Sequence, residues 1–121
     1  MEAFSQIRDR RSAGTIRELT DRMVEQVRPE KVFLFGSFAE GSDTPESDYD
    51  FYLVVSDDAD PWDARARARR AVRPVQDRPV DIVVGTNSRF EKYGPSPDTF
   101  FIEGEVFRKG LLLYDRAKGA Q

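Results

Sequence analysis

The stretch VFLFGSFAEGSDTPESDYDFYLVV, residues 32–55, decides the fold. An apolar run leads into the pair Gly36-Ser37, and a second apolar run follows the two aspartates Asp48 and Asp50. Side chains two positions apart on a strand point to the same face, so both carboxylates would project together. Two negative charges held this close repel each other, which a folded chain tolerates mainly when a cation lies between them. Carboxylate oxygens are the ligands that Mg²⁺ prefers, so the stretch predicts a metal site.

Two further features extend this prediction. Gly36 permits a tight turn with close backbone approach, and Ser37 adds a hydroxyl beside backbone N–H groups, a combination suited to phosphate. A third acid, Asp81, lies in a second short apolar run over residues 79–84. Because a buried charge is normally paired or metal-bound, we expect Asp81 to complete a set of three carboxylate ligands. A phosphate-binding turn beside a carboxylate cluster predicts metal-dependent phosphoryl or nucleotidyl chemistry.

Plainer interpretations exist for each feature. Asp48 and Asp50 would then be solvent-facing acids at a strand edge, and Gly36-Ser37 an ordinary turn after a strand. Asp81 would be a structural acid paired with Arg73 or Arg78. The co-occurrence of the three features in one chain favours the metal and phosphate interpretation.

Composition restricts the chemistry further. The 121 residues contain no cysteine and no histidine, which excludes thiolate zinc sites, disulfides and the usual Ser-His-Asp hydrolases. A net charge of −3 argues against a strongly basic nucleic-acid binder, so we expect no direct nucleic-acid contact. No apolar run approaches the roughly 20 residues that cross a bilayer, and the N-terminus lacks a signal-peptide core. We therefore expect a cytoplasmic protein that contacts no membrane.

Hydrophobic periodicity and capping residues predict the elements. We expect an amphipathic helix over 16–27 with Thr15 and Glu18 as a capping box, and a helix of about 15 residues that opens at Pro61 behind Asp60. We expect a last helix from Ser96-Pro97 to Lys109, stopped by Gly110. Strands are expected over 31–35, 49–55, 79–84 and 111–114, with loops over 36–47 and 85–97.

This order predicts an α+β or α/β fold: a small mixed sheet with helices that cover one face. The length predicts a single domain over residues 1–121, with its core within about 15–116. The strand over 49–55 is expected to be a buried central strand.

Gly36-Ser37, the Asp48-Tyr49-Asp50 triplet and Asp81 on a following strand resemble the signature of the DNA polymerase beta-like nucleotidyltransferase superfamily. Within it, so short a chain resembles the minimal nucleotidyltransferases (MNT), the antitoxin partners of HEPN toxins. The resemblance implies that Asp48 and Asp50 hold the metals, two Mg²⁺ ions, while Asp81 binds one of them and helps to activate the attacking hydroxyl. It implies ATP as the substrate.

The resemblance further implies transfer of AMP to a hydroxyl of a HEPN-type ribonuclease encoded by a neighbouring gene. The resemblance also implies that larger, antibiotic-modifying members carry a helical domain that builds the acceptor site. We expect no such domain in these 121 residues, so another protein would supply the acceptor. One alternative is a non-catalytic module that neutralises its partner sterically. Another is a small-molecule nucleotidyltransferase of the antibiotic-modifying type.

The chain departs from the family pattern just after Gly36-Ser37. Many members have arginines there, whereas this chain has Phe38, Ala39 and Glu40. Arg89 and Lys92 are the candidates for the cation that meets the triphosphate. The arginine-rich segment 65–73 is expected to be a solvated helix face, with docking to an acidic partner as the alternative. Trp62 and the phenylalanines Phe100, Phe101 and Phe107 are expected to be core or interface residues.

Overall fold

The structure is a computed structural model that describes residues 3–98 and 100–118. Its elements follow in the order η1 (Ala3–Gln6), α1 (Arg10–Val27), β1 (Lys31–Phe35), α2 (Ser37–Glu40), β2 (Tyr49–Val55), α3 (Pro61–Val72), β3 (Val80–Thr86), α4 (Asn87–Tyr93), α5 (Ile102–Lys109), β4 (Leu111–Asp115) and η2 (Arg116–Lys118). No helix among these residues is both long and apolar enough to cross a lipid bilayer.

The four strands form one mixed sheet in the order β3-β2-β1-β4. β1 pairs antiparallel with both β2 and β4, and β2 pairs parallel with β3. A parallel pair needs a crossover connection, which α3 supplies between β2 and β3. The predicted mixed sheet flanked by helices is confirmed.

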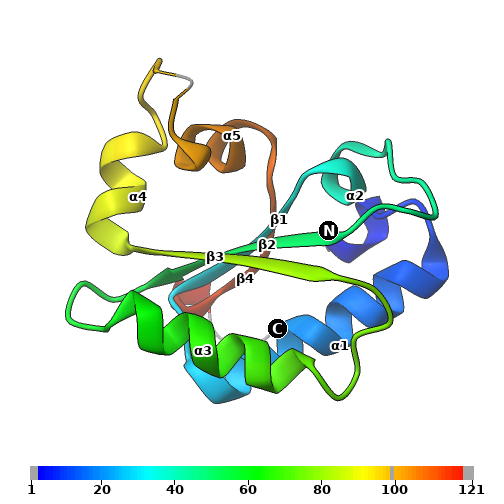
Figure 1. Ribbon diagram of the computed structural model, residues 1–121. Coiled ribbons are helices and arrows are strands. Elements are labelled where there is room, and N and C mark those ends of the chain that lie inside the picture. The colour runs from blue at the N-terminus through cyan, green and yellow to red at the C-terminus, as the bar shows by residue number, and fades with distance from the viewer. Residues whose placement is uncertain (1–2, 99, 119–121) are drawn as a thin grey trace.

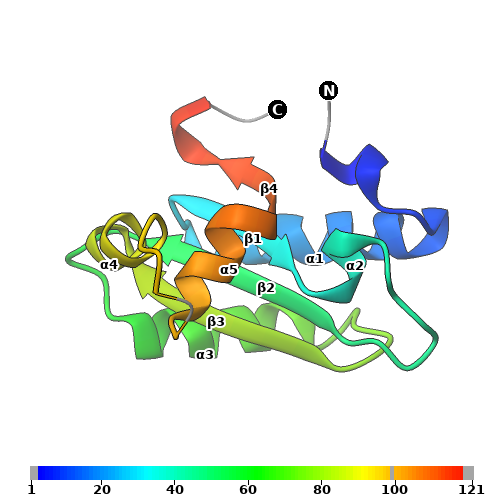
Figure 2. The same cartoon turned by 90° about the horizontal axis from the view of Figure 1, so that it is seen from above.

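Helices lie on both faces of this sheet, and the expectation of one covered face was wrong. Figures 1 and 2 show α1 and α3 on one side and α4 and α5 on the other. Two apolar clusters fill the two interfaces. The first joins α1 and α3 to residues such as Leu34, Phe51 and Ile82, and the second joins Phe90 and Val106 to Tyr52 and its neighbours. The alternation of side chains along each strand explains both clusters.

Two helix starts differ from the prediction because capping residues were misread. α1 begins at Arg10, where the Asp9 carboxylate accepts a hydrogen bond from the Ser12 N–H at 3.2 Å. Thr15 lies inside the helix and its hydroxyl bonds to the Arg11 carbonyl instead. α5 begins at Ile102 rather than at Ser96-Pro97, although it ends at Lys109 with Gly110 as the C-cap, as predicted.

The predicted loops contain two short helices. α2 occupies the start of the 36–47 segment, and α4 occupies much of 85–97 behind Thr86, whose hydroxyl caps it. α3 begins at Pro61 with Asp60 as its N-cap, as predicted, but Trp62 is 80% exposed and takes no part in the core.

The arginine-rich helix α3 is tied to the sheet edge. Arg65 is half-buried, and its Nε donates a hydrogen bond to the Ile82 carbonyl of β3 at 2.9 Å. A second tie joins the two helices on this face, from Arg22 Nε to the Ala71 carbonyl at 2.6 Å. Arg67, Arg69 and Arg73 are exposed, so a solvated face describes only part of the segment.

Candidate functional site

Gly36 ends β1 in a conformation that favours glycine, with φ of 76°. A Cβ atom at this position would overlap Asp50 Oδ2 and lie 3.2 Å from Asp50 Cγ. The closeness follows from the sheet register, which pairs Phe35 of β1 with Asp50 of β2. The absence of a side chain at Gly36 therefore makes room for the Asp50 carboxylate.

Asp50 and Asp81 lie directly beside each other on neighbouring strands. The parallel register of β2 and β3 pairs these two residues, at a strand spacing of about 4.8 Å. By alternation, Asp50 points to the same face as Tyr52 and Val54, which is the face covered by α4 and α5. Asp48 precedes β2 and is exposed. The structure thus joins Asp50 and Asp81 by sheet pairing and leaves Asp48 at the approach to the strand.

The surroundings of Asp81 differ from the expectation. β3 is an edge strand and the Asp81 side chain is exposed, so burial does not force this acid to have a partner. Arg78 pairs with Asp77 at 3.9 Å, and among the described residues neither Arg78 nor Arg73 forms an ion pair with Asp81. The interpretation of Asp81 as half of a structural ion pair is therefore not supported.

The pKa of Asp50 rises from its ordinary value to about 6. Burial is the largest cause, because it disfavours the charged form, and the charges of Asp81, Asp48 and Glu105 add to it. Glu105 lies on α5 and was not identified from the sequence. Its position depends on how α5 packs over the sheet, for which no local pattern in the sequence gives a signal.

The acidic groups fit a cation electrostatically, since Asp48, Asp81 and Glu105 all lie close enough to the half-buried Asp50 to raise its pKa. As the side chains stand, no three acidic groups within residues 3–98 and 100–118 enclose a position for a metal ion. Asp50 and Asp81, paired in register, form the fixed part of the site. Asp48 is exposed and precedes the strand, so its side chain is less constrained.

The loop before Asp48 is held by local and long-range hydrogen bonds. The Ser47 hydroxyl accepts from the Thr44 N–H at 2.8 Å, and Arg78 Nη1 donates to the Ser47 carbonyl at 3.1 Å. The Arg78 guanidinium also lies over the rings of Phe38 and Tyr49, at 5.2 and 5.1 Å from their centroids. Arg78 therefore fixes the residue that precedes Asp48.

Ser37 starts α2 directly after Gly36, and the helix turns back through bonds from the Ala39 and Glu40 N–H groups to the Gly36 carbonyl. Phe38 is buried against Tyr49, with ring centroids 4.9 Å apart. The residue that follows Ser37 is therefore a core residue in this chain and offers no side chain to a phosphate.

Arg89 and Lys92 lie at the wrong end of the sheet to meet a triphosphate at Gly36-Ser37. Both belong to α4, which follows the end of β3, whereas Asp81 is near its start. Five residues of strand separate Asp81 from Thr86, about 16 Å at 3.3 Å per residue. Arg89 is also engaged, because its Nε lies 2.8 Å from Glu103 Oε2. Its guanidinium lies 4.9 Å from the centroid of the Tyr93 ring.

A buried polar network anchors α5 above the site. The Tyr52 hydroxyl donates to Glu103 Oε2 at 2.6 Å, and Arg89 bonds to the same oxygen. Burial and the Glu103 carboxylate raise the pKa of Tyr52 above its ordinary value. Gly85 makes room for the Tyr52 hydroxyl, which a Cβ there would overlap. Because Tyr52 is two residues from Asp50 on the same face, the network fixes α5 relative to the acids.

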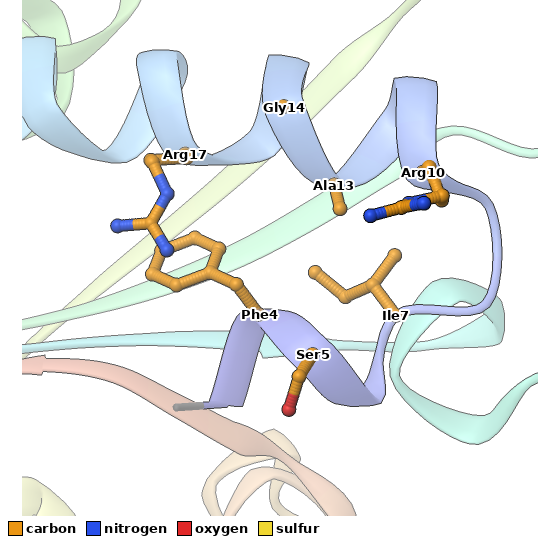
Figure 3. Close-up of a pocket in the computed structure, with 7 residues that line it drawn as sticks. All are labelled: Phe4, Ser5, Ile7, Arg10, Ala13, Gly14 and Arg17. Atoms are coloured by element: carbon orange, nitrogen blue, oxygen red, sulfur yellow. The ribbon is translucent and has the colours of Figure 1, made fainter. Parts of the chain in front are cut away.

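A pocket of about 400 Å³ lies between η1 and α1 (Figure 3). Its walls include Phe4, Ile7 and Ala13, with Arg10 and Arg17 on the α1 side. The pocket is on the α1 side of the sheet, whereas Asp50 faces α5. It is therefore separate from the acidic site.

Comparison with known proteins supports a common fold and family. Residues 17–118 match the family described as "Polymerase beta, Nucleotidyltransferase". A provisionally assigned nucleotidyltransferase from Sulfolobus solfataricus superposes with a TM-score of 0.60 at 20% identity, over 89% of this chain and 84% of that chain. No curated protein gives a significant match.

Two toxin–antitoxin structures share the same fold. One, solved with AMP-PNP, gives a TM-score of 0.51 at 18% identity over 84% of this chain and 75% of that chain. The other is a mutant of the pair MntA-HpeT with two aspartates replaced by glutamate. It gives a TM-score of 0.54 at 15% identity over 84% and 75% of the two chains. At these identities the likeness establishes the fold.

Proposed function

Because the chain belongs to the polymerase beta family of nucleotidyltransferases, we propose that it transfers AMP from ATP to a hydroxyl of a partner protein. The partner we propose is a HEPN-type ribonuclease toxin encoded by a neighbouring gene, which the modification neutralises. The observation that carries the transferase part is the register pairing of Asp50 with Asp81 beside Gly36, whose lack of a side chain leaves room for the Asp50 carboxylate. Paired carboxylates thus lie next to the start of α2, where the Ser37 hydroxyl and backbone N–H groups are suited to phosphate.

The proposed roles follow from position. Asp48 and Asp50 would hold the two Mg²⁺ ions, and Asp81 would bind one of them and accept the proton of the attacking hydroxyl. Gly36 and Ser37 hold the β- and γ-phosphates through backbone N–H groups and the serine hydroxyl. Bound Mg²⁺, in two ions, supplies charge neutralisation for the triphosphate and the departing pyrophosphate.

The acceptor oxygen forms a bond to the α-phosphorus of ATP, and the bond from that phosphorus to the bridging oxygen of the β-phosphate breaks. The hydroxyl proton passes to the Asp81 carboxylate, and pyrophosphate leaves. The product is a phosphodiester between AMP and the acceptor.

Support for a partner protein is independent of the acids. Phe100 and Phe107 are 85% and 53% exposed on the α4–α5 side of the sheet, which is the side that Asp50 faces. Two structures of similar fold are toxin–antitoxin structures, one of them with AMP-PNP. Both observations favour an acceptor that is a protein rather than a small molecule.

The test is incubation of the purified chain with ATP labelled at the α-phosphate, Mg²⁺ and the protein encoded by the neighbouring gene. The proposal expects label on that protein, a mass increase of one or more AMP units, and neither with Asp50→Asn. A stable complex without label, together with full neutralisation of toxicity, would instead establish the steric binding module. Label on a small molecule alone would contradict the choice of acceptor.

A further inference from the structure

Among the described residues, the groups that act on Asp50 beside the Gly36-Ser37 turn are all acidic: Asp48, Asp81 and Glu105. Arg78 is the basic side chain already placed near this turn, but it lies against the rings of Phe38 and Tyr49, in the apolar cluster on the α1 side of the sheet. A nucleoside triphosphate and the three aspartates together carry more negative charge than two Mg²⁺ ions compensate. Enzymes that bind such groups usually add Lys or Arg side chains.

The pairing of β4 with β1 brings a lysine to this place. The two strands are antiparallel, and Leu111 lies opposite Leu34. Moving two residues forward from Leu34 reaches Gly36, and moving two residues back from Leu111 reaches Lys109. Lys109, the last residue of α5, therefore lies level with the Gly36-Ser37 turn. Figure 2 shows α5 across the sheet between α4 and α2.

Side-chain contacts agree with this placement. Lys109 Nζ lies 4.0 Å from Glu40 Oε1, at the end of the short helix that Ser37 begins. Glu105 is one helical turn before Lys109 on α5, and it is close enough to Asp50 to raise the pKa of that acid. One side of α5 thus presents Glu105 to the acids and Lys109 to the turn.

Lys109 can exchange its ion pair with Glu40 for an ion pair with a bound phosphate. The two side chains are 59% and 39% exposed, and an exposed pair at this distance contributes about 1 kcal/mol or less. A bound phosphate offers Lys109 a more highly charged partner with several acceptor oxygens. Glu40 would then turn to solvent at little cost.

We propose that Lys109 binds the terminal phosphates of the nucleotide at the Gly36-Ser37 turn, and that Glu40 is its counter-ion when no nucleotide is bound. The proposal rests on the proposed nucleotidyl transfer at this site and names a cationic side chain for the nucleotide's terminal phosphates. It assigns opposite effects to the two partners, because Glu40 competes with the phosphate for the same ammonium group.

The test measures the affinity for ATP with Mg²⁺ by calorimetry in four variants. Lys109→Gln is expected to raise Kd about tenfold, the size of one lost charge-assisted contact. Lys109→Arg should stay within about threefold of the wild type. Glu40→Gln should lower Kd about two- to fivefold, because the lysine is released. Arg108→Gln is the matched control, since it removes the same charge one residue away and should leave Kd within about twofold.

A second ligand separates a local contact from a general charge effect. Lys109→Gln should weaken the binding of inorganic tripolyphosphate by about the same factor as the binding of ATP. It should leave the affinity for AMP unchanged, because AMP lacks the terminal phosphates. Lys109 is exposed, so thermal melts are expected to match the wild type.

The outcomes distinguish this proposal from the one on which it rests. If the wild type binds ATP with Mg²⁺ and Lys109→Gln behaves like Arg108→Gln, the role of Lys109 is overturned while nucleotidyl transfer stands. An equal loss of affinity for AMP and for tripolyphosphate in Lys109→Gln would also overturn the role of Lys109. If the wild type binds no nucleotide at all, both proposals fail together.

Discussion

Gly36 lies so close to the carboxylate of Asp50 that a methyl group on Gly36 would overlap Asp50 Oδ2. The two residues belong to different strands, and the carboxylate occupies the space that any other side chain at position 36 would take. The glycine therefore serves the acid as well as the turn.

Gly36→Ala should destabilise the fold by about 2–4 kcal/mol and abolish metal-dependent nucleotide binding. Part of the loss is backbone strain at positive φ, of order 1–3 kcal/mol, and the rest is displacement of Asp50. Gly41→Ala is the matched control, because Gly41 has φ of 77° and nothing within 4 Å of an added Cβ. Thermal melts and calorimetry on both variants check this. Equal losses of nucleotide binding in the two would show that displacement of Asp50 has no part.

Asp50→Asn should change the pH dependence of stability in the absence of metal. The folded pKa of Asp50 is about 6, above its ordinary value near 4, so the folded state holds the proton more tightly than the unfolded chain. Its contribution is fully present below about pH 4 and is lost as pH rises through about 6. We therefore expect equal stability of wild type and variant at pH 4. At pH 7 we expect a gain of about 1–2 kcal/mol in the variant, since water screens part of the repulsion.

Urea denaturation in EDTA at pH 4, 5, 6 and 7 measures this difference. The lowered pKa values of Asp9 and Asp57 act in the opposite direction in both proteins and cancel in the comparison. Glu46→Gln, an exposed loop substitution, is the control for the removal of one acidic group from the same protein. A constant difference between Asp50→Asn and the wild type would show that Asp50 titrates normally.

Asp81→Asn should preserve nucleotide binding with Mg²⁺ through Asp48 and Asp50 but lose transfer. The loss is expected in turnover, because the proton of the acceptor hydroxyl is removed only as the new bond forms. Co-expression with the neighbouring gene, scored by growth, and mass spectrometry of the partner report the two properties. Rescue of growth without added mass would contradict the enzymatic account. Toxicity with an intact complex would support it.

Tyr52→Phe should destabilise the protein by about 1–3 kcal/mol, because it removes a hydrogen bond from the buried carboxylate of Glu103. Tyr49→Phe is the matched control. The Tyr49 hydroxyl is also buried, but within the described residues it forms no hydrogen bond of good geometry and has only the side chains of Ser12 and Asp77 nearby, so its removal should cost less than about 1 kcal/mol. Chemical denaturation of both variants gives the comparison. Similar losses in the two would mean that packing at the hydroxyl, and not the bond to Glu103, is responsible.

Much of the fold could be predicted from the sequence, because continuous apolar runs indicate buried strands. The strands over 31–35 and 49–55 have the predicted bounds, and Asp60 with Pro61 marked the start of α3. The start of α1 was missed because residues 10–14 carry no apolar stripe, and only the cap by Asp9 extends the helix there. α4 was missed because Phe90 is its one buried residue.

The candidate site was accessible only in part. Asp50 and Asp81 lie on the same face of the sheet and opposite each other in the parallel register of β2 and β3, as expected. The apolar sequence of β3 did not reveal that this strand lies at the edge of the sheet. Because helices cover both faces of β3, its sequence is as apolar as that of a central strand. The positions of Glu105 and Lys109 at the site depend on how α5 packs on the sheet and connects to β4. The local sequence does not indicate tertiary packing of this kind.

The hydrogen bond from Arg65 to the Ile82 carbonyl has a consequence for solubility. An open sheet edge offers unpaired backbone groups to strands of other molecules and is a common starting point for aggregation. β3 is such an edge, and Arg65 covers one of its carbonyls while the neighbouring Asp81 adds a charge that an incoming strand would have to bury. The edge that carries the site is thereby protected against sheet extension while its carboxylates stay accessible to a ligand.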